Sequence, residues 1–147
     1  MLLLKTLTGS RLYGTASPDS DYDYICVYSE NIKSRHKIKD GYDVQEWSLS
    51  TFMKLAWKGS HNALDIMWCP VNFPEVDLLT AMRLGFRVDP WVAWPRFIKT
   101  IQSVTDRDDR KGRLHAARLQ HNLDSIMDKG WYDPTEFARV TNWREIE

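Results

Sequence analysis

The residues best suited to act together chemically lie between Gly9 and Asp23. Asp21 and Asp23 open an alternating stretch, and Gly9 and Ser10 form a turn signal just upstream. Alternate residues of a strand share one face, so the two carboxylates point the same way, where they repel unless a cation lies between them. Mg²⁺ is typically held by one or two carboxylates together with substrate phosphates. Gly9 and Ser10 would supply a close backbone approach, a hydroxyl and N–H groups for phosphate oxygens. The pattern predicts a metal and phosphate site of the kind that nucleotidyl transfer requires.

A third carboxylate is expected to complete such a site. Asp43 lies between Tyr42 and Val44 at the start of a further predicted strand. In that position it could ligate the catalytic metal and accept the proton of an attacking hydroxyl. Glu46 is the alternative, but it lies three residues on and faces the opposite side of an ideal strand. Asp43 is favoured, and the choice between the two stays open at this point.

Hydrophobic patterning indicates that short strands position these residues. The first residues are apolar and end at Gly9, which predicts a buried strand running into a turn. A loop with one helical turn after Ser10 follows. Period-two alternation then predicts a second strand, and the polar, basic segment after it predicts an exposed loop with a short strand. The expected strands cover about residues 2–7, 22–28 and 42–47, with the short one inside 29–40.

The rest of the chain is predicted to be mainly helical. Ser48 or Ser50 can cap a helix that Gly59 ends, whereas the apolar residues 62–69 are too few to assign. Further helices are expected over about 75–84, 90–105, 112–129 and 134–143. Strands followed by helices predict an α+β (α/β-like) fold with a small mixed sheet. We expect a catalytic core over 1–88 and a helical C-terminal part over 89–147, packed as one unit.

The amino-acid composition excludes several classes of protein but does not by itself indicate a function. The 147 residues include 20 Lys+Arg and 20 Asp+Glu, and 43% are apolar, which excludes bulk disorder and a polybasic nucleic-acid binder. Any nucleic-acid contact must therefore be local. Cys26 and Cys69 are too few for a disulfide scaffold and are interpreted as reduced thiols in a cytoplasmic protein. No apolar run approaches the ~20 residues of a membrane span, so no membrane partner is expected.

The central motif is specific enough to suggest a family. Residues 9–23 read Gly-Ser-Arg-Leu-Tyr-Gly-Thr-Ala-Ser-Pro-Asp-Ser-Asp-Tyr-Asp and are followed by the isolated Asp43. This arrangement resembles the DNA polymerase β-like nucleotidyltransferase superfamily, and within it the small nucleotidyltransferases of bacteria and phages found with RNA-repair genes. Weaker similarity continues downstream, although an extra residue precedes Asn62 and Asp replaces that group's Glu. The further matching positions are Asp43 to Phe52, Gly59, Asn62, Leu64, Asp65, Lys111, His115, Ala116 and Arg118.

The resemblance implies roles for individual residues. Ser10, with Gly9, would bind the triphosphate, Asp21 and Asp23 would hold two Mg²⁺ ions (or Mn²⁺), and Asp43 would complete the catalytic metal site. Helical spacing adds that Lys111, His115, Arg118 and Asn122 fall on one stripe. With Arg11, the first three of these are further candidates for phosphate or acceptor contacts.

The implied reaction moves a nucleoside monophosphate from a nucleoside triphosphate such as ATP to an acceptor hydroxyl, with release of pyrophosphate. An RNA 3′ end, such as that of tRNA, is the favoured acceptor, and a protein hydroxyl, as in antitoxin-type nucleotidyltransferases, is the alternative. A small-molecule acceptor ranks third. A non-catalytic nucleotide- or metal-binding module is a further reading, which the three intact carboxylates disfavour. The nucleotide used, the number of residues added, the oligomeric state and any need for a partner stay open.

Other readings of the same residues are weaker. In an EF-hand, Asp19 and Glu30 would be the first and last ligands, but Tyr24 occupies the position that requires glycine. An Asp-x-Asp pair also serves metal-dependent glycosyltransferases, which the upstream Gly-Ser and Asp43 disfavour. His61 and His121 are interpreted as structural or surface residues. Four tryptophans are expected in the core or at an interface: Trp57, Trp68, Trp91 and Trp94.

Overall fold

Four strands form a mixed sheet that carries the predicted acidic residues at one end. The computed structural model describes residues 1–69 and 77–147. The strands are β1 (Leu2–Thr8), β2 (Tyr22–Tyr28), β3 (Arg35–Lys39) and β4 (Tyr42–Ser48), in the spatial order β1-β2-β4-β3. The β2–β4 pair is parallel and the other two pairs are antiparallel. All three predicted strands and the short strand of the basic segment are confirmed.

The register of β2 against β4 aligns the important carboxylates. Asp23 lies opposite Asp43, and Glu46 lies opposite Cys26. On the face that carries Asp23, Ile25 and Val27 are completely buried beneath the helices. Glu46 therefore points to the other face of the sheet, as the ideal alternation predicts.

A two-residue turn joins β3 to β4 and sets the register between these two strands. Lys39 pairs with Tyr42, which leaves only Asp40 and Gly41 between the strands. Both adopt positive φ, 52° at Asp40 and 81° at Gly41, as a type I′ hairpin turn requires. Asp-Gly is a favoured pair for such a turn, because glycine has no Cβ and aspartate tolerates the left-handed region.

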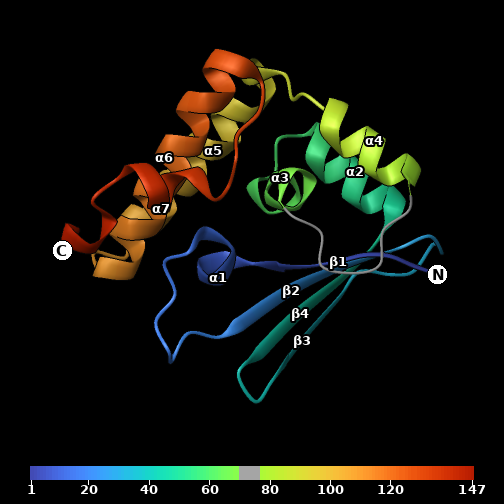
Figure 1. The fold of residues 1–147 in the computed structure, drawn as a ribbon, viewed down its shortest axis with the longest axis horizontal. Coiled ribbons are helices and arrows are strands. Elements are labelled where there is room, and N and C mark those ends of the chain that lie inside the picture. Colours follow the sequence, from blue (N-terminus) through green and yellow to red (C-terminus); the bar gives the residue numbers. More distant parts are fainter. Residues whose placement is uncertain (70–76) are drawn as a thin grey trace.

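The helices pack on one side of the sheet (Figure 1). They are α1 (Gly9–Tyr13), α2 (Leu49–Trp57), α3 (His61–Trp68), α4 (Asp77–Gly85), α5 (Pro90–Thr105), α6 (Arg110–Lys129) and α7 (Glu136–Val140), followed by a 3₁₀ turn at Trp143–Glu145. The Ser48 hydroxyl caps α2 by accepting from the Thr51 N–H. The apolar run that could not be assigned is α3. The helix expected over 75–84 is α4, and its expected first residues lie outside the described part of the chain.

The C-terminal helices form an antiparallel pair that shares the core of the sheet domain. Gly112 of α6 lies so close to the Val104 carbonyl of α5 that a Cβ there would collide with it. One apolar cluster joins Ile25 of the sheet to Phe97 of α5 and Leu119 of α6, all at most 1% exposed. The helix expected over 134–143 is shorter, because α7 ends at Val140 and a 3₁₀ turn follows.

Tryptophans divide between the core and the surface. Trp68 packs against Phe86 and Tyr132, and its indole N–H donates to the Phe86 carbonyl. Trp57 and Trp91 are 71% and 76% exposed, and Trp94 is 43% exposed, so the prediction that they are core residues is wrong. An interface role for them stays a prediction. Within residues 1–69 and 77–147, no helix is both long and apolar enough to cross a membrane.

Candidate active site

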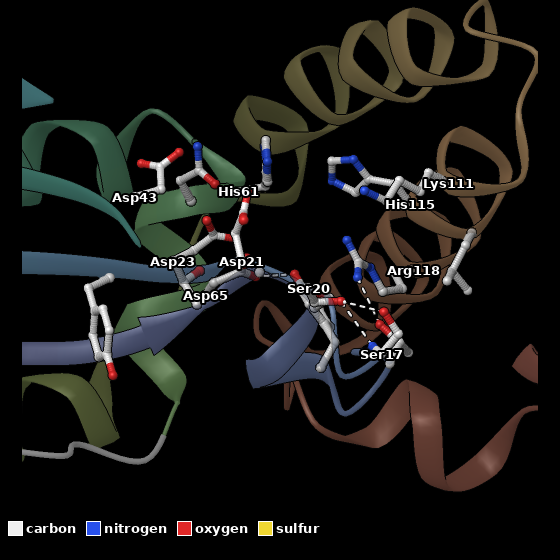
Figure 2. A pocket seen from close by; sticks show the side chains of 18 of the residues that line it. Ser17, Ser20, Asp21, Asp23, Asp43, His61, Asp65, Lys111, His115 and Arg118 are labelled. Carbon is white, nitrogen blue, oxygen red and sulfur yellow. Dashed lines mark hydrogen bonds between the residues drawn. The ribbon is translucent and has the colours of Figure 1, made fainter. Parts of the chain in front are cut away.

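A pocket of about 430 Å³ opens where β1 ends and where β2 and β4 begin. Its lining includes Asp21, Asp23 and Asp43 from the sheet side and residues of α6 from the other side. Figure 2 shows the three aspartates facing Lys111, His115 and Arg118 across this space. The pocket therefore has an acidic wall and a basic wall, whose residues lie far apart in the sequence.

Burial and repulsion among carboxylates both act on Asp23 in the acidic wall. Burial raises the pKa of Asp23, and the negative charges of Asp43 and Asp21 raise this pKa further. The positive charges of His36 and Lys111 oppose the shift. A carboxylate whose ionisation is disfavoured by two others gains most from a bound cation. The acidic wall thus has the electrostatics of a cation site.

Gly9 allows the backbone to approach this wall closely. Its φ is +66°, and a Cβ at this position would collide with Oδ2 of Asp23. Both the conformation and the space therefore require glycine. Gly9 starts α1, and Ser10 follows it in the lining of the pocket, while the Ser10 carbonyl accepts from the Thr15 N–H to close the turn. The Gly-Ser pair is where the sequence pattern placed the phosphate cradle.

Asp43, and not Glu46, shares the pocket with Asp23. Oδ1 of Asp43 lies 2.5 Å from Nε2 of His36 on β3. On the opposite face, Glu46 lies 3.5 Å from Arg35 and 3.3 Å from Lys37. A hydrogen bond from Tyr28 lowers the pKa of Glu46 despite its burial. Glu46 is thus occupied by a separate ionic cluster.

The basic wall is centred on Arg118 of α6, which is only 8% exposed. One of its terminal nitrogens donates to the Thr15 hydroxyl at 3.1 Å, and its guanidinium lies 4.2 Å from the centre of the Tyr13 ring. Its Nε is buried without a hydrogen-bond partner. Burying a charged donor without a partner is costly, and the guanidinium as a whole brings positive charge to the pocket that it lines. Lys111, Arg107 and Arg110 add positive charge to the same lining.

A buried hydrogen-bond network fixes α1 to the helical part. Asp65 of α3 is 2% exposed, and its Oδ1 accepts from the hydroxyls of Tyr13 and Tyr132, each at 2.5 Å. Burial raises the pKa of Asp65 to about 6, although both hydroxyls and the charge of Arg118 act in the other direction. Asn122, which is completely buried, donates to the Tyr13 hydroxyl at 3.4 Å. The turn that carries Ser10 is therefore tied to α3 and α6.

Two neutral imidazoles meet in the pocket, His61 from α3 and His115 from the α6 wall. The rings of His61 and His115 meet edge-on with centroids 5.7 Å apart (Figure 2). Burial, together with the positive charge of Arg118, lowers the pKa of His61 to about 4 and that of His115 to about 3. Near neutral pH the two rings can therefore donate and accept hydrogen bonds without adding charge to the pocket.

Comparison with known proteins identifies the family. The model described as "RlaP: RNA repair pathway DNA polymerase beta family" matches residues 1–85, which are more than half of the chain and carry all three aspartates. The chain belongs to this family. This match to the RNA repair pathway DNA polymerase beta family confirms the predicted resemblance. The mixed sheet with flanking helices is consistent with the nucleotidyltransferase fold of the family.

One curated relative is an "Uncharacterized 38.9 kDa protein in nrdC-mobD intergenic region" of Enterobacteria phage T4. It is 31% identical over 86 residues, which cover 46% of this chain and 26% of the phage protein. The chain thus spans about a quarter of the length of that relative.

The structure brings together most of the predicted site residues of this family member. The predicted residues that line the pocket are Gly9, Ser10, Asp21, Asp23, Asp43, Lys111, His115 and Arg118. Arg11 is not among the lining residues: it donates to the Ser20 carbonyl at 2.8 Å and stacks 3.8 Å from the centre of the Tyr22 ring, where it shapes the loop before β2. Asn122, on the same predicted stripe, supports Tyr13 from within the core.

The local sequence around some residues of the site does not indicate that they belong to it. His61 was interpreted as structural or surface, yet it lines the pocket opposite His115. Asp65 was matched to the family's downstream segment without a role. Arg107 and Arg110, which also line the pocket, lie in a charged turn that resembles an ordinary solvated loop.

Proposed function

We propose that this chain transfers a nucleoside monophosphate from a nucleoside triphosphate to an acceptor hydroxyl, with the 3′ end of an RNA as the acceptor. One observation carries the proposal: a single pocket has three carboxylates on one wall and Lys111, His115 and Arg118 on the other. A triphosphate with its divalent cations needs both kinds of wall, the acidic one for the cations and the basic one for the phosphate oxygens. Membership of the RNA repair pathway family supports the same chemistry.

The donor set of the acidic wall fits Mg²⁺. Asp21, Asp23 and Asp43 offer the hard oxygen ligands that this ion prefers, and the pKa of Asp23 is raised by burial and then by repulsion from Asp43 and Asp21, which a cation would relieve. Within the described ranges, no three His, Cys, Asp or Glu side chains are arranged to hold a metal by themselves. Mg²⁺ in nucleotide sites takes part of its coordination from substrate phosphates. Bound there, Mg²⁺ would supply positive charge to the reacting phosphate oxygens.

The chain's own residues then have distinct tasks. Ser10 and the N–H groups of the turn after Gly9 bind the β- and γ-phosphates, and the guanidinium of Arg118, which lines the same pocket, contacts a phosphate oxygen. Asp43 accepts the proton of the acceptor hydroxyl as its oxygen attacks the α-phosphorus. One phosphorus–oxygen bond forms, the bond to the β-phosphate bridge breaks, and pyrophosphate leaves.

His61 and His115 suit a contact with the uncharged part of the substrate. Because both rings are neutral near pH 7, they can hydrogen-bond to a ribose hydroxyl or to a base edge. The positive charge needed by the phosphates remains with Lys111 and Arg118. We propose that the histidine pair orients the nucleoside and the basic residues hold the phosphates.

A labelling experiment tests the proposed function. The protein is incubated with each α-³²P-labelled nucleoside triphosphate and Mg²⁺ or Mn²⁺ in a total cell extract, and the label is then located by digestion with ribonuclease or protease. Label that is released by ribonuclease is expected. Label that is released only by protease assigns a protein acceptor, and label in small molecules assigns a small acceptor.

The matched control is the double variant Asp21→Asn and Asp23→Asn. Asn keeps the size and shape of each side chain but removes the charge, so the variant is expected to fold and to lose transfer. Transfer at the wild-type rate by this variant would contradict the proposed mechanism. Binding of a non-hydrolysable triphosphate with Mg²⁺, without any labelled product in any fraction, would instead indicate a non-catalytic nucleotide-binding module.

A further inference from the structure

A second pocket of about 270 Å³ adjoins the candidate active site. It lies between the turn before α3 and one face of α5, and its lining residues are Gly59, Ser60, His61, Arg96, Phe97, Lys99 and Thr100. His61 lines both pockets, so the two adjoin at this side chain. A substrate held at the carboxylates would reach the second pocket by passing His61.

The lining of this second pocket is basic. Arg96 and Lys99 contribute two positive charges, whereas none of the lining residues is acidic. Both side chains are exposed, and neither forms an ion pair with another residue of the described ranges 1–69 and 77–147. The charge of Arg96 also contributes to the lowered pKa of His61, which indicates that the cation is close to the shared residue. Two unpaired cations in a groove favour an anionic ligand.

We infer that the Arg96–Lys99 pocket binds the phosphodiester backbone of the acceptor RNA, upstream of its reactive 3′ end. The inference rests on the proposed function. An RNA that places its 3′-hydroxyl beside Asp43 must extend its preceding nucleotides out of the site, and each of these nucleotides carries one phosphate. The route past His61 offers cations to those phosphates. A local contact of this kind also suits a chain whose net charge is zero.

Direct binding measurements test this inference without relying on catalysis. Single-stranded RNA of two or six nucleotides, labelled at the 5′ end, is titrated with wild-type protein without any nucleoside triphosphate, and the Kd is measured by fluorescence anisotropy at several salt concentrations. The six-nucleotide RNA is expected to bind more tightly than the two-nucleotide RNA, because only the longer one reaches the second pocket.

Charge reversal then locates the contact. In the double variant Arg96→Glu and Lys99→Glu, the affinity for the six-nucleotide RNA should fall by roughly tenfold or more, and its dependence on salt should become shallower. Affinity for the two-nucleotide RNA should change little. The control double variant Lys33→Glu and Lys54→Glu makes the same change in net charge at exposed positions outside both pockets, and it should bind like the wild type.

Three results would overturn the inference: equal affinity of the wild type for both RNA lengths, equal loss in the two double variants, or wild-type affinity in the Arg96–Lys99 variant. None of these would contradict the proposed function, which depends on transfer and on Asp21 and Asp23. If transfer takes place but the label enters only protein, RNA is not the acceptor and the inference fails while the nucleotidyl transfer stands.

Discussion

The paired histidines and Asp65 make opposite predictions about stability as a function of pH. Both imidazoles have a lowered pKa, about 4 for His61 and about 3 for His115, compared with an ordinary value of 6.5. As the pH falls below 6.5, the unfolded chain takes up protons on these rings and the folded chain does not, so stability is lost. Asp65 has a raised pKa of about 6 compared with an ordinary 3.8, so its contribution falls as the pH rises from about 4 to 6.

The size of the effect at pH 5 follows from these values. The unfolded chain carries almost one extra proton on each histidine, and the folded chain carries almost one extra proton on Asp65. Unfolding therefore leads to uptake of about one proton by these three groups, which makes the free energy of unfolding fall by about 1 kcal/mol for each unit of decreasing pH. Replacing His115 with Gln should reduce this slope by about 1 kcal/mol per unit, and replacing Asp65 with Asn should increase it by about 1 kcal/mol per unit.

Urea denaturation followed by tryptophan fluorescence between pH 4.5 and 6 measures these slopes. Every other titrating group is common to the three proteins, so the differences between their slopes isolate His115 and Asp65. The decisive feature is that the two variants change the slope in opposite directions. Parallel curves of free energy against pH for all three proteins would refute the assigned protonation states.

Four further substitutions test the site. Gly9→Ala should destabilise the fold by about 1–3 kcal/mol and prevent binding of a triphosphate, because the added Cβ meets a carboxylate at positive φ; thermal unfolding and nucleotide titration check both effects. Tyr13→Phe removes one of the two hydroxyls that satisfy Asp65 and should cost about 1–3 kcal/mol in urea denaturation, whereas an unchanged midpoint would argue against the network. Asp43→Asn should abolish transfer and Glu46→Gln should preserve it in the labelling assay; the reverse result would reassign the third carboxylate.

The acidic wall could be predicted from sequence because local rules place its residues. Alternation along a strand put Asp21 and Asp23 on one face and separated Asp43 from Glu46, and the register Asp23↔Asp43 follows from pairing β2 with β4. The stripe of Lys111, His115 and Arg118 was predictable for the same reason, since helical spacing is local. The packing of α6 on the core brings this stripe to the carboxylates, and local sequence patterns do not predict that packing.

The missed residues depend on contacts between distant segments. His61 became part of the site because α3 presents it to His115, and Asp65 because two tyrosines from opposite ends of the chain reach it. Nothing in the local sequence distinguishes such residues from ordinary helical ones. For Trp57 and Trp91 the expectation of a core position was wrong. Their size and hydrophobicity suggest burial, yet each lies on an outward-facing position of its helix.

The turn at Asp40–Gly41 adjoins the reaction centre, because the Gly41 carbonyl accepts from the Tyr22 N–H at the start of β2. Its two residues set the register of β3 against β4 and so bring His36 to Asp43, while the pairing of β4 with β2 places Asp43 beside Asp23. An exposed hairpin tip ordinarily tolerates lengthening well. Here an inserted residue would shift β3 along β4 and separate His36 from the carboxylate that it contacts.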